Sequence, residues 1–586
     1  MNPADHLSPA ALDRAQRHLL AKAIGELSHE RLLSPAPDGA DGWLLTTPAG
    51  DTTYTFTARR LTLDHWVVDP AGLERHVKGE PAPLDVQAFV TEHAPLLGIP
   101  DQLLPTYLEE LASTLASTMW KLAHADVPVP ALVDADHQTV EAAMTEGHPA
   151  FLANNGRIGF DLDDYTAYAP EAGRTLRLVW LAARREHTHL SLGDGLTEAA
   201  LYDGELDAPT RDGFEDRLRG LGLDPADYLL LPVHPWQWRH QVAITFAPDL
   251  ARRDLVHLGE GPDEYRPQQS IRTFANDSRP GRHFVKTALA IQNMGFVRGL
   301  SPAYMGLTPA INDWVASVVE GDPTLRACGF GVLRERAAIG YTGDAFHALD
   351  RPSPYRKMLA ALWRESPVHR VGEGERLMTM AALLHRDKAG RSLVAALVQR
   401  SGLAPADWLR RYLDAYVRPV VHCLLAHDLA FMPHGENLVL VVRDGVPVRA
   451  LMKDIGEEVA VMSTTRPLPE DVERIRIDVD QDVRSLALHT DVMDGFLRFL
   501  GAILHEDGVL DVDSFWGEVA ACLRRHADEH PELAEAVAAY DLARPEFRHS
   551  CLNRLQLRNT LQMVDLADQA ESLLYAGTLT NPLAGR

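Results

Sequence analysis

The sequence predicts an α+β protein of several domains, in which helical segments alternate with antiparallel hairpins. Apolar residues recur at helical spacing near both ends of the chain. Elsewhere short apolar runs flank turn signals, and the clearest is Asp444-Gly445 between Leu438–Val442 and Val446–Ile455. A length of 586 residues favours three or four domains.

The N-terminal part predicts a helix-rich domain with a small sheet. Ser8-Pro9 is a helix start, because serine caps the N-terminus and proline suits the first helical position. The apolar stripe of this helix consists of Leu12, Leu19, Leu20, Ile24 and Leu27. Residues 43–47 and 52–58 flank a Pro-Ala-Gly-Asp turn and predict a hairpin, and residues 101–125 predict a second long helix.

Two polar stretches follow, and each has a structural and a functional interpretation. Residues 146–171 are rich in Gly, Asn, His and Pro; such a loop can be a connector, but His148, Asn155 and Arg157 also suit a polar ligand. The run LLLPVHPWQ ends with His234 and Gln237 beside two prolines. Structural capping and ligand contact remain equally open for that pair.

A second hairpin is predicted by residues 269–274 and 283–291 around the turn at 276–281. It carries Arg272 and Lys286, and Arg298 follows shortly after it. Together with the hydroxyls of Ser270 and Thr273, these cations suit phosphates or a carboxylate. The alternative is a solvated sheet face. Because the charges alternate with apolar residues, the sequence favours a binding role.

The C-terminal half predicts mainly helices. Between residues 352 and 419 the segments YRKMLAALWRE, RLMTMAALLH and WLRRYLDAYVRP have helical patterns, as do residues 483–505 and 515–527. The last helical segment, SCLNRLQLRNTLQMVDLAD, places Arg554 and Arg558 four residues apart on one face, where surface charge is the simplest interpretation.

The hairpin around Asp444-Gly445 is the strongest functional candidate. In an antiparallel pair the start of one strand lies beside the end of the other. The residues His434, Glu436 and Asn437 are therefore expected near Lys453, Asp454 and Glu457. The Asn437 and Asp454 oxygens suit Mg²⁺, which prefers hard oxygen ligands and phosphates. The sequence therefore predicts a metal-nucleotide site here; the alternative is a surface hairpin with solvated ends.

Composition narrows the function further. A formal charge of −25 argues against non-specific nucleic-acid binding, and an anionic ligand would need a locally basic pocket. The four cysteines are scattered without CxxC spacing and indicate neither a zinc site nor disulfides. The N-terminus lacks the apolar region of a signal peptide, and no apolar segment is long enough to span a bilayer. A cytoplasmic protein without membrane partners is expected.

The usual nucleotide and hydrolase signatures do not occur. There is no GxxxxGK[ST] loop, no GxGxxG after a strand, no HExxH and no GxSxG. If ATP binds, side chains on two hairpins must hold it.

A set of motifs resembles the siderophore synthetases that act independently of nonribosomal peptide synthetases, the IucA/IucC family. The motifs are SIRT (270–273), HFVK (283–286), the arginine of FVRG, HGEN (434–437) and Lys453-Asp454, with EGHP and PVHPWQ. They occur in family order over nearly the whole chain. Phrases such as EGHPAFLANNGRIGF, LGEGPDEY and the C-terminal NPLAGR are similar to the desferrioxamine synthetase branch.

One departure from the family bears on the substrate. Many members, including citrate users, have HPxHPxxKxRxGF, whereas this chain has Phe151 and Asn155 at the second His and the Lys. Two potential donors for a tricarboxylate are therefore missing. This departure favours a longer, less anionic succinyl-type substrate.

The resemblance implies adenylation of a carboxylate by ATP with Mg²⁺, followed by attack of an amine and amide formation. It assigns Arg272, Lys286, Ser270 and Thr273 to the phosphates, and Asn437 and Asp454 to Mg²⁺. Arg298 and His434 would hold the attacking carboxylate and the charge near the α-phosphate. Substrate contacts are assigned to the following residues: His148, Asn155, Arg157, His234, Gln237 and Arg298.

For the fold, the resemblance implies a cupped hand and a homodimer. Its parts would be an α-rich thumb at 1–142, fingers with the phosphate-binding hairpin at 143–350, and a palm with the HGEN/KD hairpin at 351–586. The expected substrate is N-hydroxy-N-succinylcadaverine, a small molecule that combines a hydroxamate with a diamine. The expected reaction is its oligomerisation and ring closure to a desferrioxamine-type trihydroxamate.

Three alternatives remain. A citrate-using synthetase of the same family would form citrate amides. A kinase-like phosphotransferase would also place an Asn and an Asp on Mg²⁺, but it would release ADP instead of AMP and pyrophosphate. A ferric-siderophore or nucleotide-binding protein would bind its ligand without consuming ATP.

Overall fold

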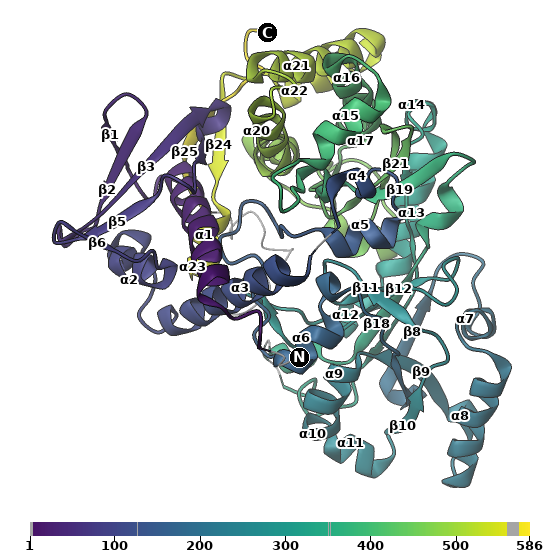
Figure 1. Cartoon of the computed structure of the whole chain (residues 1–586). Helices are drawn as coiled ribbons and strands as arrows, with labels where there is room; N and C mark the ends of the chain where they lie inside the picture. The colour runs from purple at the N-terminus through teal and green to yellow at the C-terminus, as the bar shows by residue number, and fades with distance from the viewer. Residues whose placement is uncertain (1–3, 126, 350, 352, 559–573) are drawn as a thin grey trace.

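The computed structural model describes residues 4–125, 127–349, 351, 353–558 and 574–586. It confirms the predicted α+β class: helices pack against mainly antiparallel sheets around three large hydrophobic cores. In Figure 1 the N-terminal elements lie at the left, the middle of the chain forms the lower right, and the C-terminal helices form the upper right.

The first helix, α1 (Pro9–His29), begins where the sequence predicts, and the Ser8 hydroxyl accepts a hydrogen bond from the Ala11 amide at 3.3 Å. Four of the five predicted stripe residues are buried in the N-terminal core. Leu12 is 40% exposed, so its assignment to the stripe is wrong. The predicted second long helix is α3 (Leu104–His124), which packs on α1.

A six-stranded sheet completes the N-terminal part, with α2 (Val86–Leu97) beside it. The predicted hairpin is formed by β2 and β3, paired from Gly42 with Thr57 to Thr46 with Thr53. The strands are β1 (Ala36–Asp38), β2 (Gly42–Thr46), β3 (Thr52–Leu61), β4 (His65–Val68), β5 (Glu74–Val77) and β6 (Glu80–Ala82).

The middle of the chain is built on two sheets. A six-stranded sheet has the order β11-β12-β13-β18-β17-β8, and a three-stranded sheet has the order β10-β7-β9. The strands are β7 (Val179–Arg184), β8 (Thr188–Leu192), β9 (Tyr228–Val233), β10 (Leu255–Glu260), β11 (Tyr265–Pro267), β12 (Thr273–Asn276), β13 (Phe284–Thr287), β17 (Glu335–Tyr341) and β18 (Ala360–Arg364). The helices are α6 (Leu162–Tyr168), α7 (Glu198–Glu205), α8 (Ala208–Gly220), α9 (Pro235–Gln237), α10 (Ala243–Thr245), α11 (Ala247–Arg252) and α12 (Pro302–Met305).

The second predicted hairpin is present but shorter than expected. Its strands are β12 and β13, with Thr273 opposite Lys286. Residues 269–272 form a turn in which Ile271 has a φ of 57°, so Ser270 and Arg272 precede the strand instead of lying on it, although the predicted strand began at residue 269.

The segment YRKMLAALWRE was predicted as helix, and this prediction is wrong. Residues 354–357 form a single 3-10 turn, and β18 is a central strand between β13 and β17. Every residue of β18 is buried. An apolar run of this length fits a buried strand as well as a helix, and here the two flanking strands decide. RLMTMAALLH likewise begins as β19 (Glu375–Thr379) and continues as a 3-10 helix.

The C-terminal part holds the hairpin around Asp444-Gly445. Strands β21 (Leu438–Arg443) and β22 (Val446–Met452) pair in the sheet β16-β22-β21-β19, in which β16 is Gly331–Val332. The second strand ends at Met452 and not at the predicted Ile455, because Asp454 adopts a left-handed conformation (φ 58°) that starts α18 (Ile455–Glu458).

Helices surround this sheet, and several come from earlier in the chain. They are α4 (Val129–Leu132), α5 (His137–Ala143), α13 (Thr308–Gly321), α14 (Pro323–Ala327), α15 (Leu393–Ser401), α16 (Pro405–Ala415), α17 (Val417–His427), α19 (Gln481–Arg484), η10 (Ala487–Leu497), α20 (Arg498–Glu506), α21 (Val512–Glu529) and α22 (Ala534–Tyr540). By contrast, α23 (Leu552–Arg558) packs against the N-terminal part, where Leu557 joins the core and Asn553 donates to Glu30. The helices predicted at 483–505 and 515–527 are confirmed. The last predicted helix covers residues 550–568, of which the structure describes α23; the prediction for residues 559–568 lies outside the described part of the chain.

Smaller strand pairs complete the described part of the chain. They are β14 (Gln292–Asn293) with β15 (Phe296–Val297), β20 (Leu429–Phe431) with β23 (Val459–Val461), and β24 (Glu546–Ser550) with β25 (Tyr575–Thr580). The guanidinium of Arg31, just after α1, donates to the carbonyl oxygens of Ala576 and Thr578, so the C-terminal strand lies against the N-terminal part (Figure 1). Among the described helices, none combines the length and apolar character that crossing a membrane requires.

Candidate functional site

The hairpin β21–β22 brings together the polar residues that the sequence predicts to converge. The Lys453 amide donates to the Asn437 carbonyl oxygen at 3.0 Å, so the start of the first strand lies beside the end of the second. Asp444 and Gly445 both have positive φ, at 50° and 80°, as a tight hairpin turn requires. The turn therefore sets the register that juxtaposes His434 to Asn437 with Lys453 and Asp454.

A buried charge network joins this hairpin to the middle sheet. Lys286 Nζ donates to Asp454 at 2.8 Å and to Glu457 at 3.2 Å, and Arg364 donates to the other Asp454 oxygen at 2.9 Å. Burial by itself lowers the pKa of Lys286, but the two carboxylates outweigh it and raise that pKa above its usual range. Burial would raise the pKa of Asp454, yet Lys286 and Arg364 hold it well below its usual range. Lys286 and Asp454 are therefore both charged.

Carboxylates crowd around the same point. The Asn437 amide donates to Glu458, and burial together with the Asp454 charge raises the pKa of Glu458 to about 7. Burial also raises the pKa of Glu335, whose carboxylate accepts from the Gly456 amide at 3.0 Å. Several hard oxygen groups thus lie in one buried region where their mutual repulsion is only partly relieved, which is the environment that a divalent cation stabilises.

Arginine side chains and donors without partners also belong to this region. Arg272 donates to the Gly299 carbonyl oxygen, and its guanidinium lies 3.9 Å from Glu457. Among the described residues, the buried Ser270 hydroxyl and the Nε of Arg298 have no hydrogen-bond partner. Buried donors without partners are costly, and they suit a site that an anion completes.

Arg298 lies at the edge of this region. Its guanidinium donates to the Asn293 side chain at 2.9 Å. Burial and then the Arg272 charge lower the pKa of Arg298 to about 10, so it stays protonated at neutral pH. Two arginines that repel each other in a buried place favour an anion between them.

Glu110 of α3 supports the Asn293 loop and gives a pH-dependent prediction. It accepts from the Gly295 amide at 2.6 Å, and burial raises its pKa to about 7 from 4.5. The folded protein therefore binds a proton that the unfolded chain releases between these pH values, and stability falls as pH rises through this window. Relative to the parent protein, Glu110→Gln is expected to gain roughly 2–3 kcal/mol of stability between pH 5 and pH 8.

Urea unfolding at both pH values measures this gain. Glu109→Gln is the matched control, since Glu109 is exposed on the same helix. A Glu110→Gln difference that stays constant from pH 5 to pH 8 would show that Glu110 does not hold the extra proton.

A cavity of about 270 Å³ adjoins the hairpin. Its wall includes residues of α1, β4, the loop at 146–149 and the C-terminal helices, together with His434 to Glu436. The rings of His148 and His434 lie 6.0 Å apart between centroids. Burial lowers the pKa of both imidazoles, and for His148 the nearby His434 adds to the effect. Both rings are therefore neutral at physiological pH.

Backbone contacts fix how these two rings are protonated. The Ala150 amide donates to His148 Nδ1 and the Glu436 amide donates to His434 Nδ1, each at 3.3 Å. A backbone N–H can only donate, so each Nδ1 is the acceptor and the proton of the neutral ring resides on Nε2. Each Nε2–H is therefore a donor that suits an anionic oxygen.

The far wall of the cavity is held by a buried ion pair. Arg498 of α20 donates to Glu26 of α1 at 2.7 Å and lies 2.6 Å from Nδ1 of His65. Arg498 also contacts Asp494 at 3.0 Å, and Asp494 binds His29 at 3.1 Å. These contacts tie the N-terminal helix to the C-terminal helices across the cavity.

The remaining predicted substrate residues lie in well-bonded positions. Arg157 forms a buried ion pair with Glu171 at 2.9 Å, and the Asn155 amide donates to Asn154 at 3.2 Å. His234 Nδ1 caps the turn at the Trp236 amide, at 3.0 Å. Gln237 donates to the Met358 carbonyl oxygen and accepts from the Ala290 amide. The structure thus brings His148 and Arg298 to the site, whereas these four side chains contact protein groups; their substrate roles stay predictions.

Sequence reasoning missed several residues of the site. Arg364 was missed because its segment was assigned to a helix, although the buried pattern of AALWR followed by a charge is compatible with a strand end. Lys22, Glu26 and His65 line the cavity from the N-terminal part. No local pattern could have identified them, since only the tertiary fold brings them to His434.

Comparisons with known proteins identify family models, related sequences and solved structures that match this chain. Residues 136–385 match the model of the IucA / IucC family, and residues 406–565 match a model described as ferric iron reductase FhuF-like transporter. The chain is 46% identical to putrebactin synthase of Shewanella sp. (strain MR-4), covering 99% of this chain and 92% of that protein. It is 30% identical to aerobactin synthase of Escherichia coli, over 93% of each. Its fold is similar to aerobactin synthetase IucC of Klebsiella pneumoniae, with a TM-score of 0.85, 28% identity and 98% of both chains covered.

Proposed function

The chain belongs to the IucA/IucC family of siderophore synthetases, and from this premise we propose that it activates a carboxylate with ATP and condenses it with an amine to form amide bonds. One observation carries the proposal. The cationic side chains of Lys286, Arg272 and Arg298 are buried in the same region as Asp454 and its neighbouring carboxylates. Cations for phosphates and oxygen ligands for a metal lie within one network.

The residues fit Mg²⁺ and a triphosphate on two grounds. The carboxylate cluster around Asp454 is only partly neutralised, as the raised pKa of Glu458 indicates. The Ser270 hydroxyl and the Arg298 Nε are buried donors without a partner among the described residues. We assign Asn437 and Asp454 to the metal, with Glu458 beside them. When bound, Mg²⁺ would neutralise phosphate charge and orient the phosphate oxygens.

In the first step the substrate carboxylate oxygen attacks the α-phosphorus of ATP, and the bond to the pyrophosphate oxygen breaks. Arg272 and Lys286, with the Ser270 and Thr273 hydroxyls, would hold the phosphate oxygens and stabilise the charge that develops on them. Arg298 and the Nε2–H of His434 would orient the carboxylate for attack. ATP binding would also draw Lys286 and Arg272 partly away from Asp454 and Glu457.

In the second step the substrate amine attacks the acyl carbon, and AMP leaves with the oxygen that came from the carboxylate. The cavity between α1, His148 and His434 is the place where this amine would approach. Its acidic lining residues Glu26, Glu146 and Glu436 would attract an ammonium group from solution.

We propose N-hydroxy-N-succinylcadaverine as substrate, oligomerised and closed to a desferrioxamine-type trihydroxamate. The loop after His148 supports a substrate less anionic than citrate: Phe151 is buried with its ring 4.9 Å from that of His148, and Asn155 donates to Asn154. Neither presents a cation. Putrebactin synthase, which has the highest identity among the relatives reported above, is named for a different product. The identity of the diamine is therefore the most specific part of the proposal. A homodimer and a cytoplasmic location also remain proposals.

The test is incubation of purified protein with ATP, Mg²⁺ and N-hydroxy-N-succinylcadaverine, with mass spectrometry of nucleotides and hydroxamates. AMP, pyrophosphate and trimeric linear and cyclic products are expected. ADP would instead support a phosphotransferase. Binding without any ATP turnover would support a sequestering protein, and citrate amides formed only when citrate is supplied would move the chain to the citrate-using members.

A further inference from the structure

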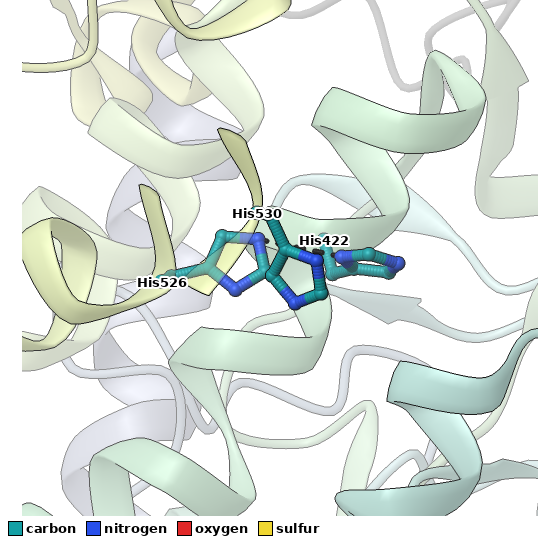
Figure 2. Close-up of side chains that lie close together, drawn as sticks. All are labelled: His422, His526 and His530. Carbon is teal, nitrogen blue, oxygen red and sulfur yellow. Dashed lines mark hydrogen bonds between the residues drawn. The ribbon is translucent and has the colours of Figure 1, made fainter. Parts of the chain in front are cut away.

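A second cluster of ionisable side chains lies in the C-terminal region, outside the network around Asp454. His422 projects from α17, and His526 and His530 come from α21 and the residue that follows it (Figure 2). One ring nitrogen from each of the three lies within 4.8 Å of the other two. The ring centroids are 4.6 to 5.1 Å apart.

The closest pair of nitrogens has the spacing of two ligands on one ion. His422 Nδ1 lies 3.4 Å from His526 Nε2. Zinc binds imidazole nitrogen at about 2.0–2.1 Å in tetrahedral geometry, so two such ligands lie about 3.3–3.4 Å apart. A hydrogen bond between the two rings would give a similar distance, and His530 Nε2 lies 3.4 Å from the Thr324 hydroxyl, so the cobalt titration below decides between a hydrogen-bonded cluster and a metal site.

Carboxylates hold the outer nitrogens of two of the rings. The Asp322 carboxylate lies 3.1 Å from His422 Nε2, and the Glu532 carboxylate lies 2.8 Å from His530 Nδ1. Asp322 is itself fixed, because its second oxygen accepts from the Thr324 and Leu325 amides. Metal-binding histidines typically donate their other N–H to a carboxylate, which orients the ring and strengthens the ligand.

The third ring is enclosed by the fold. His526 is 1% exposed, and its ring centroid lies 5.1 Å from that of His422 and 4.6 Å from that of His530. The buried thiols of Cys423 and Cys522 are not part of the cluster.

We propose that His422, His526 and His530 bind one divalent transition-metal ion of the zinc class, with Asp322 and Glu532 orienting the rings and water as a further ligand. Three nitrogen ligands distinguish this site from the oxygen site at Asp454, since Mg²⁺ prefers oxygen. The ion would clamp α21 to α17, the helix that leads through β20 into the loop carrying His434. Its role is structural support of that loop.

The test uses full-length protein without a histidine tag, freed of metal by dialysis against a chelator. Cobalt(II) is titrated in while visible absorption is recorded, and zinc is then added. One cobalt per chain with tetrahedral absorption bands, displaced by zinc and not by excess Mg²⁺, is expected. Zinc is also expected to raise the midpoint of thermal unfolding, because it binds only the folded cluster.

Variants identify the ligands. His526→Gln and His530→Gln are expected to abolish the cobalt bands and the thermal shift, whereas His240→Gln, on an exposed histidine elsewhere, should keep both. Because His526 is buried, its variant could fail to fold; His530 has a side chain 14% exposed, so His530→Gln then decides. Glu532→Gln, on a largely exposed side chain, is expected to weaken metal binding by about 10–100-fold without loss of the site.

Absence of tetrahedral bands in the parent protein, or bands that persist in folded His530→Gln, would overturn the proposal. These readouts do not depend on ATP or on the hydroxamate substrate. Failure of the metal site is therefore distinguishable from failure of the proposed synthetase activity.

Discussion

Lys286→Met is expected to lower the rate of adenylation by on the order of 10²–10³ and to destabilise the folded protein by roughly 3–5 kcal/mol. The first effect follows from loss of a positioned cation for the phosphates. The second follows because Asp454 and Glu457 both bind this ammonium, at 2.8 and 3.2 Å, and would be left as buried carboxylates with one partner fewer. ATP–pyrophosphate exchange and urea unfolding measure the two effects separately.

Lys286→Arg is the matched control, since it keeps the charge while changing the geometry. It is expected to recover most of the stability but only part of the exchange rate, because the phosphate contact depends on the position of the donor. Normal stability in Lys286→Met would show that the carboxylates find other partners. Normal exchange in a folded Lys286→Met would remove Lys286 from the phosphate site.

Arg298→Ala is expected to lower adenylation by on the order of 10²–10³ while the protein folds normally. Among the residues that the structure describes, the Arg298 side chain has one hydrogen bond, to Asn293, and burial beside Arg272 already disfavours its charge, so its removal costs the fold little. The loss should appear in kcat for pyrophosphate exchange more than in KM for ATP, because the contact is made to the reacting carboxylate.

His434→Ala is expected to have the same kinetic pattern, since the Nε2–H of His434 would donate to the same carboxylate. A matched comparison is His148→Ala, which removes the neighbouring neutral ring from the cavity wall and should affect the amine step more than adenylation. If a folded Arg298→Ala or His434→Ala exchanged pyrophosphate at nearly the parent rate, the assigned role of that residue would be wrong.

Local sequence signals predicted the hairpins well and the longer-range site only in part. Asp444-Gly445 specifies a tight turn whatever the rest of the fold does, so the convergence of Asn437 with Lys453 followed from the chain itself. Ser8-Pro9 likewise fixed the start of α1. The helix prediction for the segment containing Arg364 was wrong because a short apolar run suits either a helix or a buried strand. Pairing with the neighbouring strands β13 and β17 makes it a strand.

The cavity wall shows a second limit of the sequence. Glu26 and Arg498 pair across 472 positions of the chain, and no periodicity or turn signal connects them. The His422, His526 and His530 cluster has the same character, since α17 and α21 meet only through tertiary packing. The roles of Arg272, Lys286 and Asp454 in catalysis came from the family resemblance, and the buried ion network supplies a physical reason for them.

The most direct test of the central claim follows a labelled oxygen. N-hydroxy-N-succinylcadaverine carrying ¹⁸O in its carboxylate is incubated with the protein, ATP and Mg²⁺, and the released nucleotide is analysed by mass spectrometry. Attack of the carboxylate on the α-phosphorus predicts one ¹⁸O in AMP and none in the phosphate products. Label in inorganic phosphate, accompanied by ADP, would contradict adenylation and establish transfer of the γ-phosphoryl group instead.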